Sequence, residues 1–129
     1  RNLQNIVRFV GMVPHHELKK FYYLADLFVL LTHPDNGLEE GLGLVFLEAA
    51  AAGKPTVAGR SGGVEEAVLS GQTGLVLNVV EEPQTIVDSI VNLIEKREAS
   101  KELGQNGQNR IKSEFNWESQ LAVLRPWIE

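Results

Sequence analysis

Apolar and polar positions follow two alternating patterns along the 129 residues of the chain. Short uninterrupted apolar runs are typical of strands that are buried on both faces, whereas apolar residues that recur every three or four positions indicate one face of a helix. The runs predict strands at Ile6–Val10, Leu27–Leu31, Pro55–Ala58 and Gly74–Asn78. The periodic stretches predict helices at Pro14–Leu24, Leu42–Ala52, Val64–Leu69, Pro83–Lys96, Glu98–Glu114 and Trp117–Ile128. Because strands alternate with helices, we expect an α/β fold with a Rossmann-like parallel sheet and flanking helices.

Prolines and loops divide these elements. The five prolines are expected at element boundaries: Pro14, Pro34, Pro55, Pro83 and Pro126. Ligands of parallel α/β sheets bind at the loops that follow the carboxyl ends of the strands. Two long loops occupy that position here, Thr32–Gly41 after the second predicted strand and Gly59–Gly63 after the third. We therefore look for chemistry in these two loops.

Composition removes several classes of function. The chain has no cysteine, which excludes disulfides, cysteine-based zinc sites and thiol nucleophiles. Its 12 basic and 17 acidic residues give a net charge of −5, which argues against a nucleic-acid partner. The longest apolar stretch, Leu44–Ala52, is interrupted by Glu48 and is too short to span a membrane. The spacing of the His, Asp and Glu residues predicts no metal site.

The first candidate site is the segment from Glu40 to Glu48. Gly41 and Gly43 allow the backbone to approach a ligand closely, and they lead into a helix N-terminus, which suits phosphate. Glu48 stands among Leu, Val, Phe and Ala residues, and its carboxylate is well matched to a pair of adjacent sugar hydroxyls. The alternative is that Glu48 is a solvated helix residue and that Glu40 interacts only with the helix dipole.

The second candidate is the Gly59–Glu66 segment, in which Gly62 and Gly63 enter a short helix and offer backbone amides to an anion. Its alternative reading is an ordinary turn between a strand and a helix, with Arg60 in solvent. Among the histidines and tryptophans we expect structural roles: His15 and His16 face solvent, His33 is structural, and Trp117 and Trp127 anchor the terminal helices.

Taken together, these residues resemble the nucleotide-binding C-terminal domain of the family 4 retaining glycosyltransferases of GT-B fold. The resemblance rests on a Glu-x7-Glu motif from Glu40 to Glu48 and on motifs that follow and precede it in the family's order: Ala49–Ala58, Ser61–Gly63, Glu66, Gly71–Val76, Phe9–Pro14, Tyr23–Val29, Arg110 and Phe115–Trp117. Arg60–Gly63 and the long Asp35–Glu39 loop are most similar to mannosyltransferases of the phosphatidylinositol mannoside type.

The resemblance implies a role for each residue of the motifs. Glu48 would bind the ribose hydroxyls, and Glu40 would contact the donor sugar as the catalytic carboxylate. The amides of Gly43, Leu44 and Val45 would receive the diphosphate, beside Gly41, Gly62 and Gly63, and the backbone near Val13 would hold the base. The donor would be a GDP-, UDP- or ADP-sugar, transferred with retention of configuration and without a cofactor or an essential metal. Leu42 stands where the family usually has Phe.

The resemblance also implies an incomplete domain. The family's C-terminal domain begins with two further strands, with an Arg and Lys pair that grips the diphosphate after the first, and residues 1–129 contain neither the strands nor the pair. We therefore expect residues 1–129 to be a partial C-terminal domain with a split sheet, inactive alone, which is either an excerpt of a longer protein or is completed by a partner that supplies the missing strands. Its acceptor would be bound by an N-terminal domain. A cytoplasmic location is implied, and a peripheral position at the inner face of the membrane is compatible with it.

Two other classes of function stay open at this point. A nucleotide-sugar epimerase or a phosphorylase of GT-B type is the second enzyme reading, although we find neither the acid/base signature of the first nor a well-placed lysine for the second. A non-catalytic nucleotide-binding module is the third reading. The Glu40 and Glu48 pair speaks against this third reading without excluding it.

Overall fold

A three-stranded parallel sheet forms the centre of the computed structural model, which describes residues 3–80 and 83–128. The strands are β1 (Phe28–Leu30), β2 (Thr56–Gly59) and β3 (Leu75–Leu77), in the order β1-β2-β3. Val29 pairs with Val57, and Ala58 pairs with Val76. Each strand falls where a continuous apolar run predicts one, so three of the four expected strands are confirmed.

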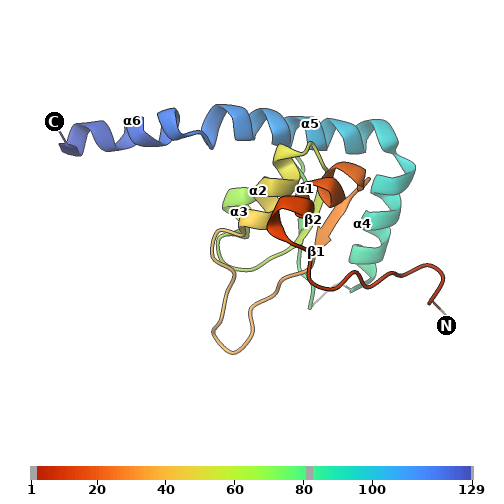
Figure 1. Ribbon diagram of the computed structural model, residues 1–129. Coiled ribbons are helices and arrows are strands. Elements are labelled where there is room, and N and C mark those ends of the chain that lie inside the picture. The colour runs from red at the N-terminus through yellow and green to blue at the C-terminus, as the bar shows by residue number, and fades with distance from the viewer. Residues whose placement is uncertain (1–2, 81–82, 129) are drawn as a thin grey trace.

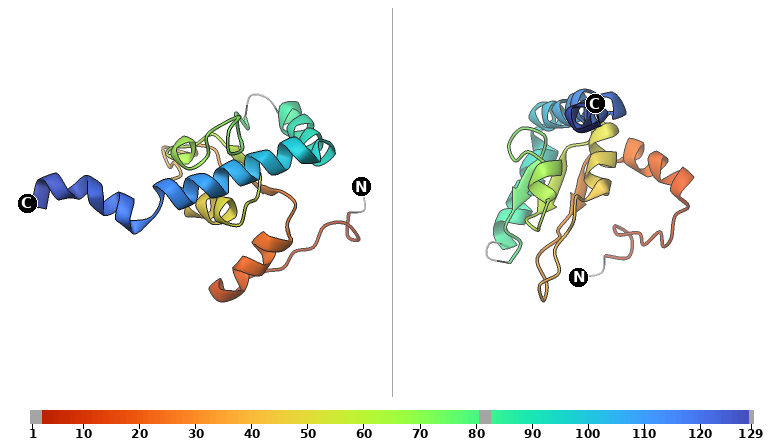
Figure 2. Two further views of the ribbon diagram at one scale, coloured as in Figure 1. Left: turned by 90° about the horizontal axis from the view of Figure 1, so that it is seen from above. Right: turned by 90° about the vertical axis from the view of Figure 1, so that its left-hand side faces the viewer.

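Six helices surround the sheet in the described part of the chain (Figure 1). They are α1 (His15–Leu24), α2 (Leu44–Ala51), α3 (Val64–Ala67), α4 (Pro83–Glu95), α5 (Arg97–Glu114) and α6 (Trp117–Ile128). In the right-hand view of Figure 2, α4 lies on one side of the sheet and α2 lies on the other, with α1 beyond it, while α5 crosses above. The predicted α/β class with a parallel sheet and flanking helices is therefore confirmed.

The core lies between α2, α3 and the sheet. Phe46 of α2 is completely buried, and its ring meets the ring of Phe28 on β1 edge to face, with the centroids 6.0 Å apart. The remaining members of this core are Ala58, Val64, Ala67, Val68 and Val76. Burial of these apolar side chains fixes α2 against the sheet and so positions the residues at its N-terminus.

Two glycines of α5 allow it to pack closely on the rest of the domain. Both Gly104 and Gly107 are buried. A Cβ atom at Gly104 would lie 2.2 Å from the carbonyl oxygen of Gly53, whereas one at Gly107 would lie 3.4 Å from the Cβ of Ala50. The helix propensity that glycine lacks is thus offset at Gly104 by contact with the turn that ends α2.

The strand expected at Ile6–Val10 does not form. In this segment Ile6 is 80% exposed and Phe9 is 95% exposed, and the N-terminal chain runs away from the sheet (Figure 1). A strand needs a neighbour that pairs with its backbone. Within residues 3–80 and 83–128 the outer edge of β1 pairs with no strand, and the exposed segment 6–10 does not form a ladder with it.

The C-terminal helix departs from prediction in two ways. Pro126 lies inside α6 rather than at a boundary, three residues from the end of the chain, where one lost intrahelical hydrogen bond matters least. Trp117 and Trp127 are 82% and 85% exposed, so the described structure does not use them as packing anchors. Figure 1 shows α6 extending away from the body of the domain.

Candidate functional site

A hydrogen bond and a close backbone approach hold the carboxyl ends of β1 and β2 together. Thr32, two residues after the end of β1, donates its hydroxyl to the carbonyl oxygen of Gly59 over 3.1 Å. A Cβ atom at Gly59 would lie 1.9 Å from the carbonyl oxygen of Thr32, so only glycine fits at this position. The two loops that follow these strands therefore begin side by side.

These two loops also contact each other directly. The amide of Glu40 donates to the hydroxyl oxygen of Ser61 over 3.1 Å, and the amide of Gly63 donates to the carbonyl oxygen of Glu40 over 3.2 Å. A Cβ atom would lie 2.0 Å from the Glu40 carbonyl oxygen at Gly62, and 2.4 Å from the Gly41 carbonyl oxygen at Gly63. The two candidate segments thus form one continuous backbone surface, which we call the joined loops (residues 40–43 and 61–63).

The joined loops lead into the N-terminus of α2. Gly43 caps this helix in the left-handed conformation, with φ of 68°, and a Cβ atom there would lie 2.5 Å from Cδ2 of Phe46. The first amide bonded back to the cap is that of Phe46, which donates to the Gly43 carbonyl over 2.9 Å. The amides of Leu44 and Val45 precede this bond, and amides at this position carry the positive end of the helix dipole. An anion would find donors here without any change of the fold.

Glu40 lines a pocket of about 410 Å³ beside the joined loops. His33 lines the same pocket, and its Nδ1 atom lies 3.0 Å from the carbonyl oxygen of Pro34. The other lining residues are Leu31, Thr32, Asp35, Leu38, Glu39 and Ser61. The pocket therefore combines carboxylates, a hydroxyl and an imidazole, which are groups that can bind several hydroxyls of one polar ligand.

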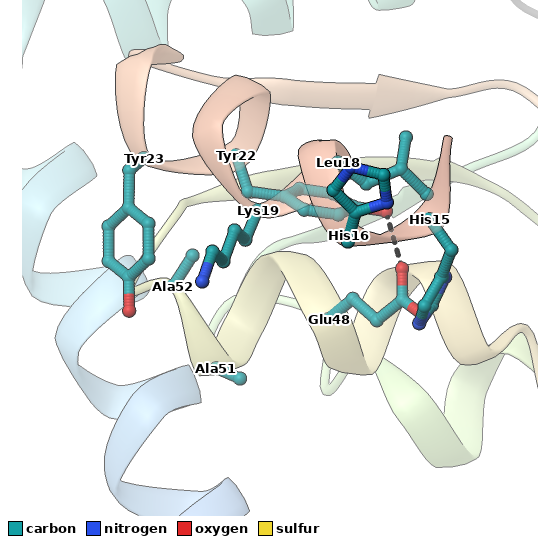
Figure 3. Close-up of a pocket in the computed structure, with 9 residues that line it drawn as sticks. All are labelled: His15, His16, Leu18, Lys19, Tyr22, Tyr23, Glu48, Ala51 and Ala52. Carbon is teal, nitrogen blue, oxygen red and sulfur yellow. Dashed lines mark hydrogen bonds between the residues drawn. The ribbon is translucent and has the colours of Figure 1, made fainter. Parts of the chain in front are cut away.

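Glu48 lies in a second pocket, of about 390 Å³, between α1 and α2 (Figure 3). The hydroxyl of Tyr22 donates to Oε2 of Glu48 over 2.8 Å. Burial of the ring and the bond and charge of the Glu48 carboxylate raise the pKa of Tyr22 from 10.0 to about 12. The remaining lining residues are His15, His16, Leu18, Lys19, Tyr23, Ala51 and Ala52.

The structure thus gathers some predicted site residues and separates others. Glu40 lies on the joined loops, but Glu48 lines a different pocket from Glu40. Val13 precedes α1 and lines neither pocket. Arg60 precedes Ser61 of the joined loops in the sequence. Its exposed guanidinium pairs with the carboxylate of Glu65, with 3.5 Å between the nitrogen and oxygen atoms.

Two residues of the site carry roles that sequence reasoning did not assign. Ser61 is 3% exposed and accepts the Glu40 amide, although the sequence shows it only as one polar residue between glycines. Tyr22 has the spacing of an apolar helix position, and it meets Glu48 across 26 positions of sequence. Local patterns carry no signal for such a long-range contact.

Across residues 3–80 and 83–128, no three His, Asp or Glu side chains gather in a way that would hold a metal ion. None of the helices in the same ranges is both long enough and apolar enough to cross a membrane.

Comparison with known proteins finds that this chain is similar to glycosyltransferases. A family model described as "Glycosyl transferases group 1" matches residues 1–110. A GDP-mannose-dependent alpha-(1-6)-phosphatidylinositol monomannoside mannosyltransferase of Mycobacterium tuberculosis is 35% identical over 124 residues. That alignment covers 95% of this chain and 32% of the mannosyltransferase, so the chain spans about a third of the length of this relative.

Solved structures give the same result for the fold. Sucrose-phosphate synthase from Thermosynechococcus elongatus superposes with a TM-score of 0.82 and 30% identity, over 98% of this chain and 31% of that one. HepE of Anabaena, in complex with UDP-glucose, superposes with a TM-score of 0.80 and 25% identity, over 98% of this chain and 34% of that one.

Proposed function

Because the chain belongs to the glycosyl transferases group 1 family, we propose that it binds the nucleotide diphosphate of a nucleotide-sugar donor. The observation that carries this proposal is the contact of Glu40 and Gly41 with Ser61, Gly62 and Gly63 at the N-terminus of α2. This contact brings the backbones of the two loops together on one surface. It lies beyond the carboxyl ends of β1 and β2, where ligands of parallel sheets bind.

The diphosphate is assigned to the amides of Gly43, Leu44 and Val45. Phosphate oxygens accept hydrogen bonds from free amides at a helix start, and the helix dipole adds attraction for the negative charge. The same donors would stabilise the charge that develops on the diphosphate as the bond to the sugar breaks. Gly41 supports the assignment because no atom lies within 4 Å of its Cβ position, and Gly62 and Gly63 support it because they allow the two loops to pack closely enough to form the site.

The two carboxylates are assigned to the hydroxyl-bearing parts of the donor. Glu40 lines the pocket beside the joined loops and is proposed to contact hydroxyls of the sugar that is transferred. Glu48 is proposed to accept hydrogen bonds from the two ribose hydroxyls, and the backbone near Val13 is proposed to hold the base. Transfer with retention of configuration, without an essential metal, completes the proposal and rests on the Glu-x7-Glu resemblance.

The donor class is supported by proteins similar to this chain. A mannosyltransferase relative depends on GDP-mannose, and a structural relative is seen in complex with UDP-glucose. The chain spans about a third of such relatives, so we assign to residues 1–129 only the donor-binding part of the reaction, as part of a C-terminal domain. Acceptor binding is assigned to an N-terminal domain. We place the protein in the cytoplasm, which the absence of cysteine supports.

Calorimetric titration of the purified protein with GDP, UDP and ADP tests the proposal. At least one of these nucleotides should bind with 1:1 stoichiometry, and the matching nucleoside without phosphate should bind more weakly because it leaves the α2 amides unused. A folded sample that binds none of the three would overturn the proposal and favour a non-catalytic scaffold.

A further inference from the structure

The hydrogen bond between Tyr22 and Glu48 has no part in the roles proposed above. The Tyr22 hydroxyl donates to Oε2 of Glu48 over 2.8 Å, and both side chains are partly buried (Figure 3). We propose that Tyr22 is a positioning residue, which holds the Glu48 carboxylate in the orientation that accepts a vicinal diol. This inference rests on the proposed function, in which Glu48 binds the ribose hydroxyls.

Aromatic packing fixes the Tyr22 ring before any ligand binds. The ring lies against Phe28 of β1, with centroids 5.7 Å apart, and Phe28 in turn lies 6.0 Å from the fully buried Phe46 of α2. Such aromatic pairs add stabilisation beyond their buried area. The series Phe46, Phe28, Tyr22 therefore starts on α2, crosses β1 to α1 and ends on Glu48, which is again on α2. We call this series the aromatic relay.

The contact orders the carboxylate without using up its acceptors. An ionised carboxylate has about four lone-pair directions, and the single bond from Tyr22 occupies one of them on Oε2. The remaining directions suffice for two hydroxyl donors of a diol. A cationic partner would instead neutralise the carboxylate, whereas a tyrosine leaves its negative charge in place. The Tyr22 hydroxyl is protonated, and hence a donor, at neutral pH, because its pKa lies above the ordinary 10.0, at about 12.

Ordering of the Glu48 side chain increases affinity because the side chain has already lost its conformational entropy in the free protein. A glutamate side chain that is free to rotate loses conformational entropy when a ligand fixes it. In this chain the aromatic relay has already fixed the side chain. The effect should therefore appear only with ligands that use the carboxylate, which separates positioning from a general contribution to stability.

Nucleotide titration of Tyr22→Phe tests the inference, with UDP and GDP as probes and Ser113→Ala as the control. The Ser113 hydroxyl lies on α5, donates to the carbonyl oxygen of Asn109 and lines neither candidate pocket. We expect Tyr22→Phe to weaken binding about fivefold, the loss of one modest hydrogen bond, and Ser113→Ala to bind as the wild type does. With 2′,3′-dideoxy nucleotides, wild type and Tyr22→Phe should bind equally. Circular dichroism and thermal unfolding confirm that each variant is folded.

Three outcomes would overturn the positioning role of Tyr22. Unchanged affinity for UDP and GDP in folded Tyr22→Phe would show that the hydroxyl is not needed, and tighter binding would show that it competes with the ribose. An equal loss for normal and dideoxy nucleotides would show a general structural effect. In a Glu48→Gln background, Tyr22→Phe should cause less than a twofold further loss, and a full fivefold loss there would also contradict the inference. Absence of any nucleotide binding to the wild type, in contrast, would overturn the proposed function together with this inference.

Discussion

The amide of Gly63 donates a hydrogen bond to the carbonyl oxygen of Glu40 over 3.2 Å, across 23 positions of sequence. This bond joins the loop that follows β1 to the loop that follows β2. It places the backbone of both loops at the start of α2, where a helix offers free amides to an anion. The donor site that we propose depends on this junction more than on any single side chain.

Substitution of Gly63 by alanine should therefore damage the junction. The backbone of Gly63 has φ of −79°, which alanine tolerates, so the effect comes from the clash of a new methyl group 2.4 Å from the Gly41 carbonyl oxygen. We expect Gly63→Ala to lower the free energy of unfolding by about 1–3 kcal/mol and to weaken nucleotide binding. Gly41→Ala, whose Cβ would meet no atom within 4 Å, is the control for stability in urea unfolding. Equal stability of the two variants would contradict the described contact.

The two glycines of α5 should respond to alanine in opposite directions. At Gly107 a methyl group would make ordinary contacts at 3.4 to 3.7 Å, so the variant should gain up to about 1 kcal/mol of helix propensity. At Gly104 the methyl group would lie 2.2 Å from the Gly53 carbonyl oxygen, and the clash should exceed that gain. Urea unfolding measures the change in the free energy of unfolding for each variant, which should be a loss for Gly104→Ala and a gain for Gly107→Ala. A gain in stability for Gly104→Ala would show that α5 does not pack on the end of α2 as described.

The raised pKa of Tyr22 predicts a loss of stability at high pH. The folded state holds the Tyr22 proton up to about pH 12, whereas the unfolded chain releases it near the ordinary value of 10.0. Between these values the folded state binds more protons, so the contribution of Tyr22 is fully present below pH 10 and is lost as the pH rises toward 12. The free energy of unfolding should fall more steeply in this window for wild type than for Tyr22→Phe. Parallel curves for the two proteins would indicate that the hydroxyl is not in its described surroundings.

The strands that the sequence predicts correctly are those whose partners lie within the described chain. The runs around Val29, Val57 and Val76 are apolar on both faces and pair with one another, so their local pattern agrees with their surroundings. Ile6–Val10 is also mostly apolar, although Arg8 interrupts it, and forms no strand, because strand formation depends on a neighbour that the local sequence does not specify. The same reasoning explains Pro126, where position near a helix end outweighs the tendency of proline to break helices.

In the candidate site, too, some features can be predicted from the local sequence and others depend on how the helices pack. The glycine-rich segments at 40–43 and 61–63 are predictable as candidate loops because glycine before a helix, at the carboxyl end of a strand, allows a close backbone approach. Their contact with each other follows from the parallel order of β1 and β2. The hydrogen bond between Tyr22 and Glu48 is not predictable in this way, because it depends on how α1 packs beside α2. Binding roles for Glu40 and Val13 are still predictions, which nucleotide binding by variants can test.

The affinity of Glu48→Ala for a nucleoside diphosphate tests the proposed donor site most directly. The titration uses whichever of GDP, UDP and ADP binds the wild type, with Glu118→Ala of the exposed helix α6 as a control that removes the same charge elsewhere. Loss of hydrogen bonds to a charged carboxylate should weaken binding to Glu48→Ala by about 1–3 kcal/mol, while Glu118→Ala should bind as the wild type does. Wild-type affinity in folded Glu48→Ala would contradict the proposed site.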